Sequence, residues 1–180
     1  RKLLPRFDVL IENYRPGTME RFGLGYETLH KLNPALIYCQ VTGFGRTGPY
    51  ANRAGFDLIA QGLSGIMSVT GEGAGRQPVK AGPPITDISA GILAAMGVLA
   101  AYVHRLKTGE GQLVKVSLTD VAFAMVANLG YMAQAQLTHA DRAQIGNDLY
   151  GAFGRDFPTK DGRRLMVVAI SLKQWQSLAD

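Results

Sequence analysis

The sequence predicts an α/β fold built on an open, mainly parallel sheet with covering helices. Three short apolar runs, at residues 8–13, 35–42 and 112–117, alternate with segments of helical pattern, which is typical of such a layer. The run at 35–42 (ALIYCQVT) is almost continuously apolar, as parallel strands covered on both faces tend to be. Hydrophobic residues make up 47% of the chain and charged residues 18%, which is ample for a packed core and excludes a disordered chain.

The first half alternates strand and short helix. The strand at 8–13 ends where Arg15, Pro16 and Gly17 break the pattern. A helical turn is expected at 18–22, and a short helix at 26–32.

The second strand, at 35–42, leads into a turn-rich loop at 43–51 and a helix at 58–64. The loop at 71–84 (GEGAGRQPVKAGPP) is longer than connectors usually are, and such loops often carry function.

A long apolar helix follows this loop. Thr86 or Asp87 is expected to cap it, and it is expected to reach about Leu106 before Gly109 ends it. Its apolar part, residues 88–103, has 16 residues, fewer than the roughly 20 needed to cross a bilayer. We therefore expect a buried helix and no membrane span.

The remaining elements have weaker signals. The third strand ends at Ser117, which with Asp120 resembles a capping box for a helix reaching about residue 136. Loop and turn are expected at 151–161, a strand at 164–170 and the start of a helix at 172–179.

Charge and cysteine content narrow the function classes. The chain has 19 Lys and Arg against 14 Asp and Glu, a formal net charge of +5, with no basic run. Nucleic acid is therefore not expected as a partner, whereas a small polyanion such as a phosphorylated cofactor fits. Cys39 is the single cysteine, which excludes a disulfide framework, fits a reducing, cytoplasmic setting, and is expected to be a core residue. Zinc-ligand spacing is absent, so no metal site is expected.

Two motifs match cofactor or catalytic patterns only in part. Gly43, Gly45 and Gly48 follow a strand with dinucleotide-fingerprint spacing, but a Pro-Tyr pair follows them. No acidic residue stands about twenty residues further on, where the ribose of NAD needs one, so NAD is not expected. There is no Gly-Lys-Ser/Thr phosphate loop, and the segment around Ser64 lacks the last glycine of a nucleophile elbow.

Asp87 is the carboxylate with two open interpretations. Aspartate is among the best helix N-caps, and capping alone would explain it. A carboxylate at a helix start is also kept ionised by nearby amides, and small neighbours such as Ala90 and Gly91 leave room for a bulky electrophile.

Taken together, the segments resemble the class III CoA-transferase family, within a superfamily of formyl-CoA transferase, carnitine CoA-transferase and α-methylacyl-CoA racemase. The resemblance is collinear over roughly residues 8–175. It is carried by DVLIENYRPG at 8–17, NPALIY at 33–38, TGFG at 42–45, GPY at 48–50, GFD at 55–57, QGLSG at 61–65, DISAG at 87–91, HR at 104–105, TG-G-Q between 108 and 112, and VSL-D between 116 and 120.

The resemblance implies a Rossmann-like fold and an acyl-CoA:carboxylate CoA-transferase activity. Asp87 aligns with the catalytic aspartate of the family, which would form a mixed anhydride with the donor acid and then an aspartyl-CoA thioester. The substrates would be an acyl-CoA donor and a carboxylic acid acceptor, with coenzyme A as the carrier. CoA contacts are expected from a loop and its neighbours: Asn13, Tyr14, Arg15, Arg21, Phe22 and, with a less defined role, Asp57.

Two alternatives to a CoA-transferase activity remain. The racemases of the superfamily use a histidine that would fall at Phe56, and phenylalanine cannot move a proton, which favours the transferase. A non-catalytic piece that binds a CoA ester is the other alternative.

The resemblance also bears on organisation. Members of the family are substantially longer, so the chain is expected to be an internal fragment, incomplete relative to the family. Residues 1–140 would be a portion of the large CoA-binding α/β domain, and 141–180 a linker and the beginning of the smaller domain. At full length the family implies an interlocked homodimer.

Overall fold

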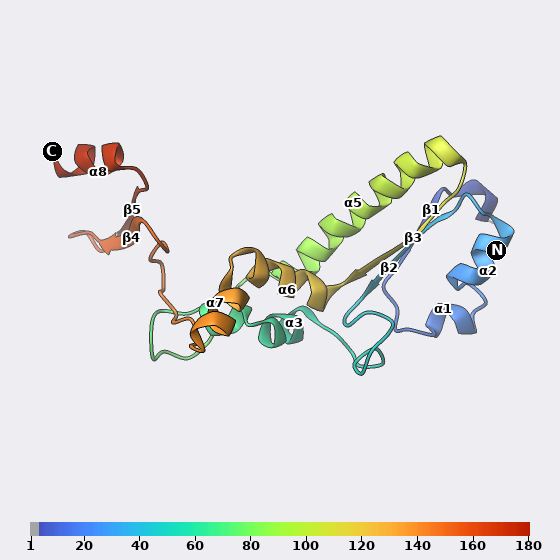
Figure 1. The fold of residues 1–180 in the computed structure, drawn as a ribbon, viewed down its shortest axis with the longest axis horizontal. Coiled ribbons are helices and arrows are strands. Elements are labelled where there is room, and N and C mark those ends of the chain that lie inside the picture. The colour runs from blue at the N-terminus through green and yellow to red at the C-terminus, as the bar shows by residue number, and fades with distance from the viewer. Residues whose placement is uncertain (1–3) are drawn as a thin grey trace.

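The α/β class is confirmed by a computed structural model that describes residues 4–180. Three parallel strands, β1 (Val9–Glu12), β2 (Ile37–Thr42) and β3 (Leu113–Ser117), pair in the order β1-β2-β3 (Figure 1). In the central strand β2, Tyr38 and Cys39 are fully buried, which explains the continuous apolar run there.

Short helices connect β1 to β2. After η1 (Leu4–Arg6) and β1 come α1 (Thr18–Arg21) and α2 (Tyr26–Leu32). Leu29 of α2 is fully buried and packs in a small core with Tyr38, so α2 covers the end of the sheet away from the strands' carboxyl ends.

The crossover from β2 to β3 contains α3 (Asp57–Ser64), α4 (Ile66–Val69) and α5 (Ile85–Thr108). The long helix α5 lies along the sheet and packs against β2 and β3 (Figure 1). Gly97 permits this approach, because a Cβ there would lie 2.6 Å from Val114 Cγ1.

The predicted start of α5 is wrong by a residue or two. Pro84 is the N-cap, so Thr86 and Asp87 lie inside the first turn, and no side chain of the cap residue accepts a hydrogen bond. The carboxylate of Asp57, in α3, caps the helix instead, since it accepts the backbone N–H of Thr86.

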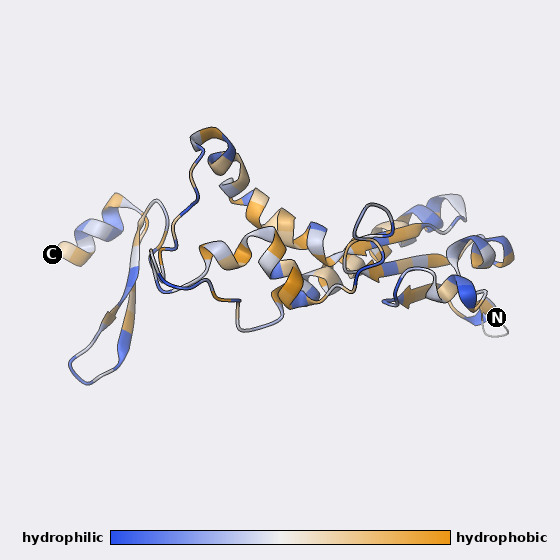
Figure 2. Cartoon of the chain, turned by 90° about the horizontal axis from the view of Figure 1, so that it is seen from below, coloured by the Kyte–Doolittle hydropathy of each residue, from blue (hydrophilic) through white to orange (hydrophobic). Residues whose placement is uncertain are grey.

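The expectation that α5 is buried holds for one face only. Ala90, Ala94 and Ala101 are buried, whereas the opposite face exposes apolar side chains such as Ile92 and Leu99, the latter 63% exposed. Within residues 4–180, α5 is the one helix that is long and apolar enough to cross a membrane by length and composition. Apolar residues gather on the central strands and on the helices beside them (Figure 2).

The helix expected to reach residue 136 is divided into α6 (Leu118–Asn128) and α7 (Tyr131–Thr138). Gly130, between them, has a φ of 73°, a left-handed conformation that ends α6. Ser117 caps α6, since its Oγ accepts the N–H of Asp120 at 3.1 Å, as the sequence predicted.

The C-terminal segment forms a separate two-stranded sheet. The strand β4 (Phe153–Pro158) pairs antiparallel with β5 (Arg164–Ala169), and α8 (Leu172–Ala179) packs on β5. The prediction of loop and turn over 151–161 was therefore wrong. The Gly and Pro residues of this segment favour a loop, but pairing with β5 makes residues 153–158 a strand. This hairpin and α8 lie apart from the three-stranded sheet (Figure 1).

Candidate active site

A cleft of about 850 Å³ opens at the carboxyl ends of the three parallel strands. Asn13 follows β1, Gly43 follows β2 and Leu118 follows β3, and all of them line the cleft. Open parallel sheets bind their ligands at this edge, because the loops that leave adjacent strands converge there. The first turns of α5 also reach the cleft, through Asp87, Ala90 and Gly91.

Two glycines shape the wall behind the cleft. A Cβ on Gly43 would lie 2.4 Å from the Cα of Gly55, and a Cβ on Gly55 would lie 2.3 Å from the Cα of Gly43. The loop after β2 therefore closes on itself at this point and leads into Phe56, whose side chain is 64% exposed and lines the cleft.

Asp87 is the third residue of α5, and it is exposed on the cleft side of the helix. Gly91 lies one helical turn further along the same face, and nothing lies within 4 Å of the position its Cβ would take. The approach to the Asp87 carboxylate is therefore open to a bulky ligand.

Asp57, the first residue of α3, holds the start of α5. Its Oδ1 accepts both the backbone N–H of Thr86 at 2.9 Å and the Thr86 hydroxyl at 2.7 Å. Its Oδ2 accepts Gln61 Nε2 at 2.7 Å. Asp57 thus satisfies a free amide of α5 from another helix, which is the work of an N-cap.

Gln61 extends this connection to the long loop. Gln61 is fully buried, and its Oε1 accepts the backbone N–H of Ala81 at 2.9 Å. The loop at 71–84, expected from its length to carry function, is thereby fixed to α3 and, through Asp57, to the first turn of α5. Lys80, next to Ala81, lines the cleft.

The pKa values of Asp57 and Asp87 are shifted in opposite directions. Burial alone would raise the pKa of Asp57, but the hydrogen bonds from Thr86 and Gln61 outweigh it and lower that pKa below its ordinary value. Partial burial, and after it the negative charge of Asp57, raise the pKa of Asp87. Asp57 therefore keeps its negative charge to a lower pH than Asp87 does.

The loop after β1 brings three of the expected CoA contacts to the cleft. Asn13, Tyr14 and Arg15 all line it, and all three are exposed, Tyr14 by 57%. Gly17, with a φ of 84°, ends this loop and begins α1.

Arg21 and Phe22 lie outside the cleft lining. Arg21, at the end of α1, donates to the Thr18 hydroxyl at 3.2 Å, and Phe22 is 67% exposed. The structure thus brings together five of the seven sequence-predicted site residues and leaves two on the neighbouring surface of α1.

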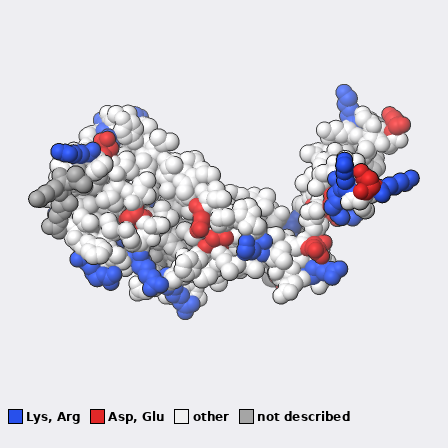
Figure 3. Space-filling model, turned by 180° about the vertical axis from the view of Figure 1, so that it is seen from behind, with Lys and Arg blue, Asp and Glu red and all other residues white. Residues whose placement is uncertain are grey.

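Sequence reasoning did not single out the basic residues Arg53 and Lys80, which also line the cleft. Lys80 Nζ donates to the carbonyls of Ala81 and Gly82, both at 3.1 Å, and Arg53 stacks over Tyr50 with its Cζ 4.3 Å from the ring centroid. The one available signal was their position in turn-rich loops. On the face shown in Figure 3, basic side chains occur along one edge of the larger part of the molecule and again at its other end.

The glycine loop at 43–48 does not run directly into a helix, since α3 begins only at Asp57. This geometry differs from the dinucleotide fingerprint, in which the loop opens onto a helix N-terminus. Among residues 4–180, no group of three or more His, Cys, Asp or Glu side chains is placed to hold a metal ion.

Comparison with known proteins identifies the family. A family model described as CoA-transferase family III matches residues 1–180. A succinate–glutarate CoA-transferase from Agrobacterium fabrum is 50% identical over 128 residues, which cover 71% of this chain and 32% of the relative. A succinyl-CoA–D-citramalate CoA-transferase from Chloroflexus aurantiacus is 39% identical over 170 residues, covering 94% of this chain and 42% of the relative.

Solved structures agree with this relationship. The crystal structure of a CaiB/BaiF family protein from Brucella suis matches with a TM-score of 0.84 and 34% identity, over 99% of this chain and 46% of that one. The structure of Rv3272 from M. tuberculosis matches with a TM-score of 0.78 and 33% identity. The chain spans less than half the length of these relatives. By sequence and by fold, it belongs to CoA-transferase family III.

Proposed function

We propose that the protein carrying this chain transfers coenzyme A from an acyl-CoA to a carboxylic acid, with Asp87 as the nucleophile. The observation that carries the proposal is an exposed carboxylate in a cleft at the carboxyl edge of a parallel sheet, in a chain of this family. The open space over Gly91 supports the approach of a bulky thioester to Asp87.

The proposed chemistry proceeds by covalent catalysis. An Asp87 oxygen attacks the thioester carbonyl, the C–S bond breaks, and CoA thiolate leaves behind a mixed anhydride. The thiolate then attacks the aspartyl carbonyl of that anhydride, so the donor acid leaves as a carboxylate and an aspartyl-CoA thioester remains.

The second half repeats these steps with the acceptor. The acceptor carboxylate attacks the aspartyl thioester and releases the thiolate, which attacks the acceptor carbonyl of the new anhydride. The new acyl-CoA leaves and Asp87 is regenerated. The thioester bond energy is conserved throughout, so the proposed cycle needs no ATP, NAD or metal ion.

For the substrates, we propose succinyl-CoA as donor and a short dicarboxylic acid as acceptor. The names of the relatives support this choice, since they specify succinate with glutarate, and succinyl-CoA with D-citramalate or mesaconate. The cleft-lining cations Arg53 and Lys80 suit the second carboxylate of such an acid.

The loop of Asn13, Tyr14 and Arg15 is proposed to contact CoA. The guanidinium of Arg15 suits a phosphate oxygen, and the exposed ring of Tyr14 can lie against the pantetheine or adenine. Arg21 and Phe22 would extend the same surface along α1 toward the nucleotide end.

We propose a cytoplasmic homodimer for the whole protein, interlocked as in its family, with no nucleic-acid or membrane partner. The exposed apolar face of α5 needs a cover, which a second subunit or the rest of the longer protein would supply, because monomers rarely leave large apolar patches in water. The buried, unpaired thiol of Cys39 suits a reducing compartment.

The direct test compares Asp87→Asn with Asp120→Asn, an exposed carboxylate on α6 outside the cleft lining. With succinyl-CoA and glutarate, Asp87→Asn is expected to lose at least about 10³-fold in kcat while CoA still binds, because it removes the nucleophile. Asp120→Asn is expected to keep its kcat. Full exchange activity in Asp87→Asn would refute the proposal.

A further inference from the structure

Glu12 is a buried carboxylate that the proposed chemistry does not use. It is the last residue of β1, it lines the cleft next to the CoA-contacting loop, and only 4% of it is exposed. Carboxylates are almost never buried to this extent without a partner, so its surroundings need an explanation.

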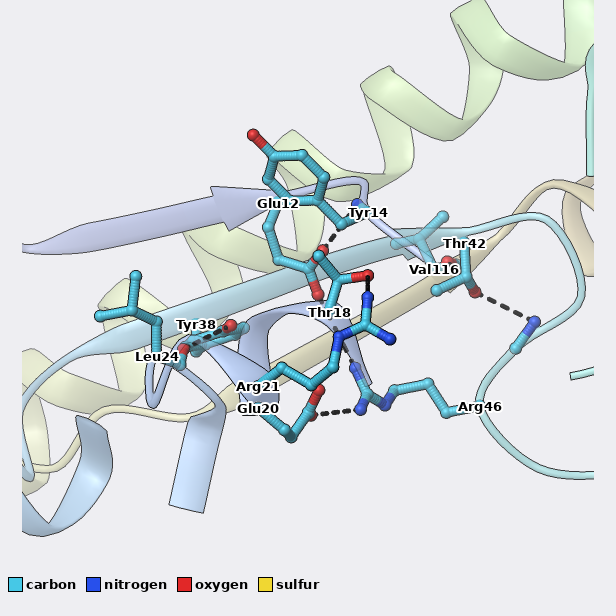
Figure 4. A network of polar contacts seen from close by, with 11 residues as sticks. Glu12, Tyr14, Thr18, Glu20, Arg21, Leu24, Tyr38, Thr42, Arg46 and Val116 are labelled. Atoms are coloured by element: carbon cyan, nitrogen blue, oxygen red, sulfur yellow. Dashed lines mark hydrogen bonds and ion pairs between the residues drawn. The ribbon is translucent and has the colours of Figure 1, made fainter. Parts of the chain in front are cut away.

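The first partner of Glu12 belongs to the loop that follows it. Glu12 Oε2 accepts the backbone N–H of Tyr14 at 2.8 Å, a charge-assisted hydrogen bond that fixes the chain direction just after the strand (Figure 4). The backbone of Asn13, Tyr14 and Arg15 therefore leaves β1 along a path set by the Glu12 carboxylate.

The second partner comes from the loop after β2. Arg46 Nη1 lies 3.8 Å from Glu12 Oε1, and the same guanidinium is paired with Glu20 of α1 (Figure 4). Glu12 Oε1 is buried, with Arg46 as the cation beside it, and the neighbouring side chain of Gln40 also lowers the pKa of the Glu12 carboxyl.

Arg46 is itself held in place. The Gly45 N–H donates to the Thr42 hydroxyl oxygen at 3.0 Å, and this hydroxyl is 3.4 Å from the carbonyl of Val116 in β3 (Figure 4). The turn that presents Arg46 is thus fixed to the central and third strands, and Arg46 connects that framework to β1 and α1.

We propose that Glu12 is a positioning residue for CoA binding: through Tyr14 and Arg46, it fixes residues 13–16 at the wall of the cleft. This inference rests on the proposed function, since it assigns the loop to CoA. It predicts that Glu12 acts on the affinity for CoA and acyl-CoA and leaves the covalent steps at Asp87 unchanged.

The affinity for CoA is expected to depend on pH through Glu12. Burial raises the pKa of Glu12, and the Tyr14 N–H and the charge of Arg46 offset this only in part. As the pH falls, Glu12 is protonated at a higher pH than an exposed glutamate, its attraction for Arg46 is lost, and CoA affinity decreases. The titratable and charged groups that interact with Glu12 are Arg46, Glu20, Tyr38 and Cys39.

The experiment measures the Kd for CoA by calorimetry, and KM and kcat with succinyl-CoA, in the whole protein that carries this chain. Glu12→Leu, which removes both contacts, is expected to raise Kd and KM about tenfold at unchanged kcat, the loss typical of one charge-assisted hydrogen bond. Glu12→Gln keeps an acceptor for the Tyr14 N–H and is expected to show a smaller increase.

The matched control is Asp8→Asn. Asp8 precedes β1 at its other end, and the substitution breaks its ion pair with Arg105 at 2.9 Å, outside the cleft lining. Its Kd and KM are expected to match the parent protein. The parent's CoA affinity should fall more steeply at acidic pH than that of Glu12→Gln, because titration of the CoA phosphate is common to both proteins and that of Glu12 is not.

An unchanged Kd in folded Glu12→Leu would overturn the inference, as would identical pH profiles for the parent and Glu12→Gln. Circular dichroism establishes whether each variant folds. If Glu12→Leu does not fold, the Kd values of Glu12→Gln and Arg46→Gln for CoA test the inference in its place. These results differ from failure of the proposed function, in which Asp87→Asn would still turn over or the parent would not bind CoA.

Discussion

The pair Asp57 and Asp87 separates two roles that an aspartate at a helix start can have. Asp57 caps α5 through Thr86 and has a lowered pKa, whereas Asp87, one residue beyond Thr86, is left exposed to the cleft. Asp87 therefore does not cap α5, which was the alternative explanation for an aspartate at this position.

Asp57→Asn tests the electrostatic coupling between the two carboxylates. Removing the Asp57 charge is expected to lower the pKa of Asp87 toward its ordinary value, which moves the acid limb of kcat/KM to lower pH. The weaker cap should also cost about 1 kcal/mol of unfolding free energy. Glu110→Gln, exposed beyond the far end of α5, is the control, and an acid limb that stays in place would contradict the coupling.

Asp87→Asn is expected to raise the melting temperature at neutral pH while it removes activity. The folded-state pKa of Asp87 is raised, so its ionised form is less favourable in the folded than in the unfolded chain. That cost is absent at low pH and grows as the pH rises through the folded-state pKa. Thermal unfolding at pH 4 and pH 7 measures it, and a melting temperature that falls equally at both would contradict the sign.

At the residue scale, the sequence was sufficient to nominate Asp87 and the loop of Asn13, Tyr14 and Arg15. It was insufficient for the contact between Asp57 and Thr86, because these residues come together only when α3 packs beside α5. Lys80 and Arg53 were missed for the same reason, since a cleft joins loops that are distant in sequence.

Among the elements, the loop after β2 and the helix α5 both line the cleft, and glycine has opposite roles in them. Gly43 is required by a close approach to the Cα of Gly55, whereas Gly91 faces open space in a helix. Gly43→Ala is expected to destabilise the fold by about 1–3 kcal/mol, because neither backbone can move away easily.

Gly91→Ala is the matched substitution with the opposite expectation. It should stabilise α5 by about 0.5–1 kcal/mol, as alanine does within a helix, yet raise KM for acyl-CoA by narrowing the approach to Asp87. Chemical unfolding and steady-state kinetics on both variants test the pair. Equal stability changes would contradict the assigned packing.

Helices and strands were predicted well where the hydrophobic periodicity of the sequence was strong. They were predicted poorly where a tertiary contact determines whether a segment is helix, strand or loop. The parallel strands and α5 followed from their apolar runs. The break at Gly130 and the strand β4 did not, because a single glycine can be accommodated within a helix, and β4 depends on its partner β5.

Considered as a whole, the molecule has an exposed apolar face on α5 that contrasts with its closely packed opposite face. Leu99→Glu places a charge on this face and is expected to shift the whole protein from dimer toward monomer, since charge is depleted from the cores of stable interfaces. Light scattering after size-exclusion chromatography measures the shift. Lys107→Glu, near the end of α5, controls for added negative charge, and an unaltered dimer in Leu99→Glu would contradict the proposed coverage.

In the proposed cycle, Asp87 carries first the donor acyl group and then CoA. The most direct measurement incubates the protein with succinyl-CoA, adds hydroxylamine to convert any acyl or thioester adduct on a carboxylate to a hydroxamate, and locates the modification by peptide mass mapping. We expect a hydroxamate at Asp87, absent when succinyl-CoA is omitted and absent in Asp87→Asn. A hydroxamate at another carboxylate, or none while exchange proceeds at its full rate, would contradict it.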